Sequence, residues 1–219
     1  KEYRRQRQMC IRDRFMGMGE PLLNFNAVIE AAKVMKDQLA YALSRKRITI
    51  SSSGIVPNIN RLNEHVDVSL AISLHASDNK LRDKLVPINK KYPLESLIES
   101  CKYFLEFHNN KRHITIEYIL IKNINDSLEH AKKLVRLLSE FPCKINLIPF
   151  NSFEGSNYER PSSEKINRFK FFLKEKGFIT TLRTTRGDGV DAACGQLVGN
   201  LSKSIKGKKL ISHLSLIHI

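Results

Sequence analysis

No run of apolar residues in the sequence approaches the roughly 18 consecutive positions that a membrane-spanning helix needs. The repeats of collagen and of coiled coils are also missing, so neither fibrous class applies. The chain begins with Lys1 rather than Met, and no apolar segment typical of a signal peptide follows it. These absences leave a globular protein.

Cysteine is scarce, with four among 219 residues: Cys10, Cys101, Cys143 and Cys194. No two of them are close together in the sequence, and there is no CxxC pair. Small secreted domains that depend on disulfides carry cysteines far more densely. The pattern therefore favours a reducing, cytoplasmic compartment.

The composition that is present is globular and strongly basic. Hydrophobic residues make up 42% and charged residues 27%, which argues against disorder. The 37 basic and 22 acidic residues give a net charge of +15. Such a positive net charge favours an anionic partner, either nucleic acid or a membrane surface. It is also compatible with a role in solubility alone.

The two ends of the chain look foreign to the rest. Residues 1–14 contain six basic and two acidic residues without apolar periodicity, a composition that could describe a basic tail gripping nucleic acid. The strings RQRQMCIRDR and LSLIHI instead resemble translated sequencing adapters. We interpret residues 1–14 and the end of a basic tail at 201–219 as non-native, with a single domain over residues 15–200. Without residues 1–14, the net charge is still +11.

Strand-like and helix-like patterns alternate from residue 15 onward. Runs rich in Ile, Val, Leu, Phe and Thr predict strands at 15–16, 47–51, 68–74, 113–121, 144–150 and 178–183. Apolar residues at helical spacing predict helices over 94–105, 128–138 and 166–173. Ser127 and the 161–164 segment supply helix starts, and Gly177 supplies a stop. This alternation predicts a parallel sheet, as a (β/α) barrel or as an open doubly wound sheet.

Polar or small residues follow every predicted strand. The strings are GMGEP (17–21), SSSG (51–54), SLH (73–75), KNIND (122–126), PFN (149–151) and RGD (186–188). Ligands of both candidate architectures bind at the C-terminal ends of the strands. We therefore expect a polar site at this edge of the sheet.

Each of these residues also has an ordinary explanation. Glu20 could accept a hydrogen bond from a ligand ammonium group or could sit at a helix N-terminus. By itself, His75 favours a hydrogen-bonded structural histidine, and Asn151 fits a turn. The GMG string allows close backbone approach, but it lacks the third glycine of a dinucleotide-binding fingerprint.

Together, the motifs resemble the RlmN family of radical S-adenosylmethionine RNA methyltransferases. The matching strings are, in order, GMGEPLLN, ISSSG, AISLHAS, LVPINKKYP, ITIEY, PCKINLIPFN and RTTRGDGVDAACGQL, from about residue 15 to about residue 199. This family methylates carbon 2 of an adenine in 23S rRNA and in some tRNAs. The resemblance implies an α/β fold, a partial (β/α) barrel of the radical-SAM type, which here would lack its first strand.

The resemblance also implies roles for single residues. The expected contacts to S-adenosylmethionine are Gly19, Glu20, Ser51, Ser73, Leu74, His75 and Asn151. Cys194 would be the catalytic cysteine that carries a methyl group from one S-adenosylmethionine, while a second supplies the radical that activates this methyl. A radical route suits carbon 2 of adenine because this carbon is electron-poor.

The surroundings of the cysteines agree with these roles. Cys194 lies between alanine and glycine neighbours, which leave a thiol accessible, as a methyl carrier requires. A free cysteine is more commonly a buried packing residue, and this is our interpretation of Cys101 and Cys143.

The sequence lacks the CxxxCxxC spacing with which the family holds a [4Fe–4S] cluster. The resemblance places these ligands, a resolving cysteine, a catalytic carboxylate and an accessory domain upstream of residue 15, and gives Cys10 no role. We therefore expect no metal ligand in this chain, and a chain that is inactive alone. We further expect 23S rRNA and tRNA as partners, no membrane, an external electron donor for the cluster, and a monomer.

Two alternatives stay open. The related enzyme Cfr methylates carbon 8 of the same rRNA adenine and shares much of the motif set. A non-catalytic basic RNA-binding module would account for the charge but not for the coexistence of GEP, SLH and DAACGQL. Such a module would bind RNA with a steep salt dependence and would not bind S-adenosylmethionine.

Overall fold

The computed structural model describes residues 13–15, 19–107, 112–152 and 156–183. Six parallel strands form one sheet, in chain order from β1 to β6. They are β1 (Asp13–Phe15), β2 (Ile48–Ser52), β3 (Ser69–Ser73), β4 (Ile114–Leu120), β5 (Cys143–Pro149) and β6 (Ile179–Leu182). Within these described residues β6 does not pair with β1, so the barrel is open. The predicted α/β partial barrel is confirmed.

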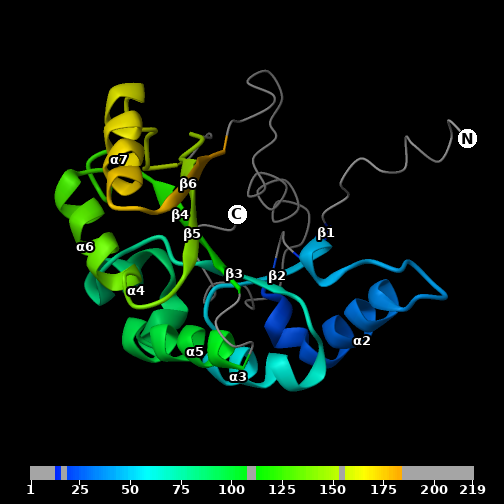
Figure 1. Cartoon of the computed structure of the whole chain (residues 1–219). Coiled ribbons are helices and arrows are strands. Elements are labelled where there is room, and N and C mark those ends of the chain that lie inside the picture. Colours follow the sequence, from blue (N-terminus) through cyan, green and yellow to red (C-terminus); the bar gives the residue numbers. More distant parts are fainter. Residues whose placement is uncertain (1–12, 16–18, 108–111, 153–155, 184–219) are drawn as a thin grey trace, which may run out of the picture.

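Helices connect the strands and lie along one face of the sheet (Figure 1). They are α2 (Phe25–Lys36), α3 (Val56–His65), α4 (Asn79–Leu85), α5 (Leu94–Glu106), α6 (Leu128–Leu138) and α7 (Ser163–Glu175). Short 3-10 turns are η1 (Pro21–Asn24), η2 (Arg45–Arg47) and η3 (Pro87–Lys90). No helix in the described part of the chain is long and apolar enough to span a membrane.

The helix boundaries follow from local chemistry. The Ser127 hydroxyl accepts a hydrogen bond from the backbone amide of His130 at 3.3 Å and caps α6. Ser162 caps α7 in the same way. Gly177, at φ 86°, follows the end of α7 in the left-handed conformation that glycine adopts without a Cβ penalty. These predicted start and stop signals are confirmed.

The two faces of the sheet differ in polarity. The side that packs against the helices is aliphatic and buried, with Ile50, Ile72, Ile116 and Ile145 at its centre. Intervening residues, which alternation turns to the other side, are mostly small or polar: Thr49, Ser51, Ser69, Ala71, Ser73, Thr115, Glu117 and Asn146. This alternation explains the serines within the otherwise apolar β3.

The first strand lies two residues earlier than predicted. The sequence pattern placed it at 15–16, whereas β1 covers Asp13–Phe15 and pairs Phe15 with Ile50 of β2. Parallel pairing uses backbone groups, so charged residues can join a strand that lacks an apolar pattern. The other strand ends agree with the predictions to within one residue.

Candidate active site

The expected cofactor contacts lie at one edge of the sheet. Ser51 and Ser73 are at or near the C-terminal ends of β2 and β3, where Ser51 pairs with Ala71 and Ser73 with Glu117. Gly19 and Glu20 follow β1, Leu74 and His75 follow β3, and Asn151 follows β5. Because all six strands are parallel, these segments meet at the same edge. Cys194 lies outside the described residues.

Glu20 joins the segment after β1 to the segment after β2. Its Oε1 accepts a hydrogen bond from the Leu22 amide at 3.1 Å and caps η1. Its Oε2 accepts from the Ser53 amide at 2.6 Å and from the Ser53 hydroxyl at 2.7 Å. The ordinary explanation, a carboxylate at a helix N-terminus, is therefore correct, and the same carboxylate also orders the serine-rich loop.

Gly19 presents an open stretch of backbone beside Glu20. Its φ of 105° is unfavourable for any residue with a Cβ. Among the described residues, no heavy atom lies within 4 Å of the place that a Cβ would occupy. Gly19 is exposed, so a ligand can approach its backbone closely.

His75 is held by the fold through its ring. The side chain is 1% exposed, and Nδ1 accepts a hydrogen bond from the Ile119 amide at 3.2 Å. Burial, followed by the positive charge of Arg82, lowers the pKa of His75 to about 3. The imidazole is therefore neutral at physiological pH and carries its proton on Nε2. The imidazole is thus engaged structurally, as the ordinary explanation of this residue suggested.

Asn125 joins the end of β3 to the end of β4. Its Nδ2 donates to the carbonyls of His75, at 2.9 Å, and Ile119, at 2.6 Å. Its Oδ1 accepts from the Ile121 amide at 2.7 Å. The end of β5 is joined to the end of β4 by a hydrogen bond from the Phe150 amide to the Leu120 carbonyl at 2.9 Å. Asn151 is the next residue after Phe150.

Arg82 bridges the two central loops and was missed by the sequence analysis. Its guanidinium is fully buried and donates to the carbonyls of Ser53 at 2.6 Å, Ser73 at 3.3 Å and Leu74 at 3.1 Å. With Glu20 and Asn125, it completes a continuous edge network from the loop after β1 to the end of β5. A basic residue inside a short segment of otherwise ordinary helix gives no local signal of burial.

Glu117 supplies a buried carboxyl group on the polar side of the sheet. The residue is fully buried and pairs with Ser73 across the strands. Its Oε1 accepts from Arg14 at 3.1 Å, but its Oε2 has no hydrogen-bond partner among the described residues. Burial raises the pKa of Glu117, opposed by the positive charges of Arg14 and Arg183. The unpaired oxygen is an acceptor suited to a positively charged ligand group.

The two described cysteines are packing residues. Cys101 on α5 and Cys143 at the start of β5 are free and buried. Burial raises the pKa of each thiol to about 12, so both are protonated and unreactive at neutral pH. Within the described part of the chain, no group of three or more His, Cys, Asp or Glu side chains could hold a metal ion.

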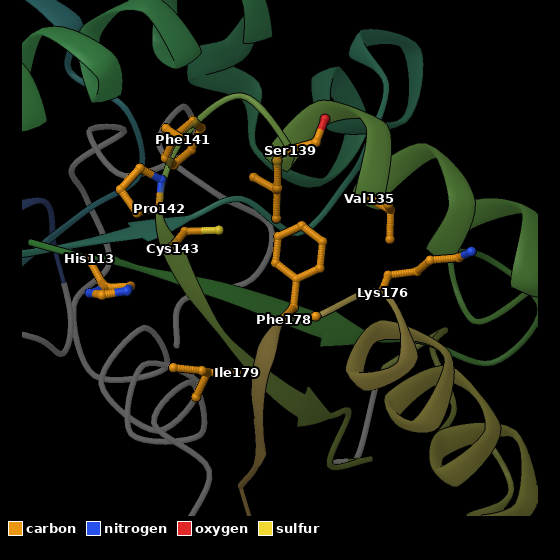
Figure 2. Close-up of a pocket in the computed structure, with 11 residues that line it drawn as sticks. His113, Val135, Ser139, Phe141, Pro142, Cys143, Lys176, Phe178 and Ile179 are labelled. Carbon is orange, nitrogen blue, oxygen red and sulfur yellow. The ribbon is translucent and has the colours of Figure 1, made fainter. Parts of the chain in front are cut away.

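A cavity of about 390 Å³ lies at the opposite, N-terminal edge of the sheet (Figure 2). Its lining is His113, Val135, Leu138, Ser139, Phe141, Pro142, Cys143, Lys176, Gly177, Phe178 and Ile179. These residues come from α6, the end of α7 and the starts of β5 and β6. Since ligands of open parallel sheets bind at the C-terminal edge, we place the candidate site at the edge network rather than in this cavity.

Known proteins resemble the chain in both sequence and structure. Residues 1–138 match the Radical SAM superfamily. Over 187 residues, the chain is 58% identical to the dual-specificity RNA methyltransferase RlmN of Pseudomonas putida, an alignment that covers 85% of this chain and 49% of that protein. The chain thus spans about half the length of the curated relatives it matches.

Solved structures give the same picture. A radical SAM methyltransferase from Sphaerobacter thermophilus superposes with a TM-score of 0.81 at 39% identity, covering 89% of this chain and 57% of that one. A domain of the pyruvate-formate lyase-activating enzyme from Bacteroides vulgatus has a TM-score of 0.58 at 18% identity, covering 78% of this chain and 98% of that one, and shares the fold. The superfamily match covers more than half of the sequence, and the chain belongs to the radical SAM superfamily.

Proposed function

We propose that the chain forms the S-adenosylmethionine-binding barrel of an RlmN-type enzyme, which methylates carbon 2 of adenine in 23S rRNA and tRNA. The observation that carries the proposal is the edge network, in which Glu20, Arg82 and Asn125 join the ends of successive strands by hydrogen bonds. Those strand ends hold the motifs GEP, SSSG, SLH and PFN. The identity of 58% to RlmN of Pseudomonas putida supports the same function.

The site has the chemistry that S-adenosylmethionine requires. This cofactor carries a sulfonium and an ammonium group, so it is drawn to buried negative charge. Among the described residues, one Glu117 carboxylate oxygen beside Ser73 has no hydrogen-bond partner, and no side chain covers the Gly19 backbone. Ser51, Ser73 and Asn151 add polar groups along the same edge.

Within this proposal, the residues divide the work. Gly19 and Glu20 form the segment that receives the amino-acid end of the cofactor, and Ser51 contributes from β2. Ser73, Leu74 and His75 form a contact strip, in which His75 acts through its backbone because its ring is bonded to the Ile119 amide. Asn151 closes the edge at β5.

The described residues do not provide a site for a [4Fe–4S] cluster, since no suitable group of cysteines is present among them. When bound, a cluster supplies the electron that starts radical chemistry in this superfamily. Cys194 is proposed as the methyl-carrying thiol.

RNA is the proposed substrate, and the charge of the chain favours it. A net charge of +15 attracts phosphate, and each phosphate contact makes the affinity more dependent on salt. A basic surface alone gives affinity for RNA without selecting an adenine. We therefore assign selection of the adenine to the C-terminal edge of the sheet, where the edge network lies, and not to the net charge.

The test uses the protein expressed from its complete gene. We expect it to bind S-adenosylmethionine and to methylate carbon 2 of adenine in 23S rRNA and tRNA, as mapped by mass spectrometry of nuclease digests. Methylation at carbon 8 would instead assign the Cfr-type activity. RNA binding with a steep salt dependence and no S-adenosylmethionine binding would assign a non-catalytic RNA-binding module.

A further inference from the structure

Arg82 is a buried cation whose hydrogen-bond partners are neutral. Its Nε donates to the Leu74 carbonyl at 3.1 Å, and its Nη2 donates to the carbonyls of Ser53 at 2.6 Å and Ser73 at 3.3 Å. Its Nη1 donates to Oδ1 of Asn89 at 2.9 Å. One planar guanidinium therefore fixes the carbonyls that follow β2 and β3 relative to each other.

Burying this charge is costly, and the cost must be offset by the carbonyls. Burial lowers the pKa of Arg82 to about 10, so the group still carries its charge at neutral pH. An apolar side chain would fill an interior position of this kind without that cost. A lysine could not span the carbonyls in the same way, because its charge is a single point and its donors do not form a planar fork.

The environment of Arg82 is built to hold it in one orientation. Asn89 accepts from the guanidinium and donates in turn to Oδ1 of Asp83 at 2.6 Å and to Oδ1 of Asn79 at 3.0 Å. The same Asn79 oxygen accepts from the Leu94 amide at the start of α5. These contacts tie the guanidinium to α4, η3 and α5 at once.

Gly54 of the SSSG string leaves room for the guanidinium. A Cβ at this position would lie 3.4 Å from Nη2 of Arg82 and 3.4 Å from Cδ1 of Leu97, and the residue has a φ of 117°. The glycine of the motif is thereby explained by its left-handed backbone, whereas a Cβ would only come into van der Waals contact with Arg82.

We propose that Arg82 is a positioning residue, which sets the spacing of the SSSG loop and the SLH strip so that both can contact S-adenosylmethionine. This inference rests on the proposed function, because those two segments are its proposed cofactor contacts. Ser53 also donates two hydrogen bonds to the Glu20 carboxylate, so a displaced Ser53 would disturb the GEP segment as well. A shift of about 1 Å in a binding element can cost about 100-fold in ligand affinity or rate.

Arg112 provides a matched control at the opposite edge of the sheet. Its side chain is largely buried, donates to the Val68 carbonyl at 3.3 Å and forms an ion pair with Asp67. It therefore also ties a backbone carbonyl beside β3, but at the N-terminal end. Loss of Arg112 should lower stability without moving the SSSG loop or the SLH strip.

The experiment compares Arg82→Met, Arg82→Lys and Arg112→Met in the protein expressed from its complete gene. Titration calorimetry measures the affinity for S-adenosylmethionine, hydrogen–deuterium exchange measures the amides of 51–56 and 73–77, and thermal unfolding measures stability. We expect Arg82→Met to weaken binding about 100-fold and Arg82→Lys about tenfold. Both should speed amide exchange in the two segments, whereas Arg112→Met should leave affinity within about twofold of the unsubstituted protein.

Two results would overturn the inference in different ways. If the unsubstituted protein binds S-adenosylmethionine and the Arg82 variants bind it as well as Arg112→Met does, or exchange no faster at 51–56 and 73–77, Arg82 is a stability residue only and the proposed function stands. If the unsubstituted protein does not bind S-adenosylmethionine, the proposed function fails together with the inference. Arg82→Lys retains the charge and most of the volume, so it decides the matter where Arg82→Met does not fold.

Discussion

At the C-terminal edge of the sheet, buried polar side chains hold the loops in place, whereas at the N-terminal edge a cavity is lined by both apolar and polar side chains. The first edge contains Arg82, His75 and Asn125, all buried and all bonded to backbone groups. The second contains the cavity between α6 and α7, with Leu138 and Phe178 in its lining (Figure 2). The two edges thus differ in how far their polar contacts extend, because the C-terminal network joins successive strand ends, whereas Arg112 at the N-terminal edge binds Asp67 and the Val68 carbonyl beside β3.

Backbone strain occurs at both edges, because Ala42 and Gly177, which precede β2 and β6, also have positive φ. Four residues with positive φ come after the first four strands in turn: Gly19, Gly54, His75 and Asn123. A non-glycine residue in this conformation is uncommon, and such residues persist where surrounding contacts hold them. The ring of His75 and the side chain of Asp126, which accepts from the Asn123 amide at 3.1 Å, supply those contacts. The difference between the edges teaches that buried polar side chains join the ends of successive strands where the ligand is proposed to bind.

The largest expected effect concerns the cysteines. In the protein expressed from its complete gene, Cys194→Ala should abolish methyl transfer to RNA, because the two described thiols, Cys101 and Cys143, are buried and protonated. Peptide mass spectrometry should find S-methylcysteine at Cys194 in the unsubstituted protein. The matched control is Cys143→Ala at the N-terminal edge, which should retain activity since that thiol is buried and protonated. An active Cys194→Ala enzyme with methylation at Cys101 or Cys143 would refute the carrier role.

A second prediction separates stability from binding at the packed edge. Leu138 is fully buried on α6 beside the cavity. Leu138→Ala should lower the free energy of unfolding by about 3 kcal/mol, through lost transfer energy and an enlarged cavity. The affinity for S-adenosylmethionine, measured well below the unfolding temperature, should not change. A parallel loss of affinity would mean that the two edges are coupled.

A third prediction concerns pH and the C-terminal edge. The pKa of His75 is lowered from 6.5 to about 3 in the folded state, so the unfolded chain binds the proton more tightly. The stability that depends on neutral His75 is therefore complete above pH 6.5 and is lost as the pH falls toward 3. Between pH 7 and pH 5 this amounts to about 2 kcal/mol, measured by urea unfolding.

His75→Asn provides the comparison for this pH effect. Asparagine tolerates the φ of 62° and can still accept a hydrogen bond through its side chain, but it does not titrate. The loss of stability between pH 7 and pH 5 should be largely absent in this variant. An unchanged pH dependence would show that other groups cause it.

The smallest expected effect concerns Glu117. Its pKa is raised by burial, so the stability linked to its protonated form is present at low pH and is lost as the pH rises through the folded-state pKa. Glu117→Gln removes the buried charge and should not lower stability at pH 7. It should weaken S-adenosylmethionine binding by about tenfold, the usual order for losing a hydrogen bond to a charged group. Unchanged affinity would remove Glu117 from the proposed cofactor site.

Much of the fold could be predicted from the sequence. The strand segments, the three helices with clear apolar periodicity, and the signals at Ser127 and Gly177 depend on residues close together in the chain. Their chemistry is local, so a pattern of apolar residues or a capping hydroxyl is sufficient. The boundaries of the first strand were predicted wrongly because residues 13–14 carry no apolar pattern. These residues join the sheet by pairing with β2.

Part of the candidate site could also be predicted from the sequence, and part of it could not. The sequence by itself determined which strand ends carry polar motifs and that these ends share one edge, since both follow from strand–helix alternation. Only the tertiary structure decided that Arg82 is buried against Ser53, Ser73 and Leu74, that the ring of His75 is bonded to Ile119, and that one Glu117 oxygen has no partner among the described residues. The reason is physical: desolvation and hydrogen bonding of these groups depend on partners up to 103 positions away in the chain, which meet only when the strands pair.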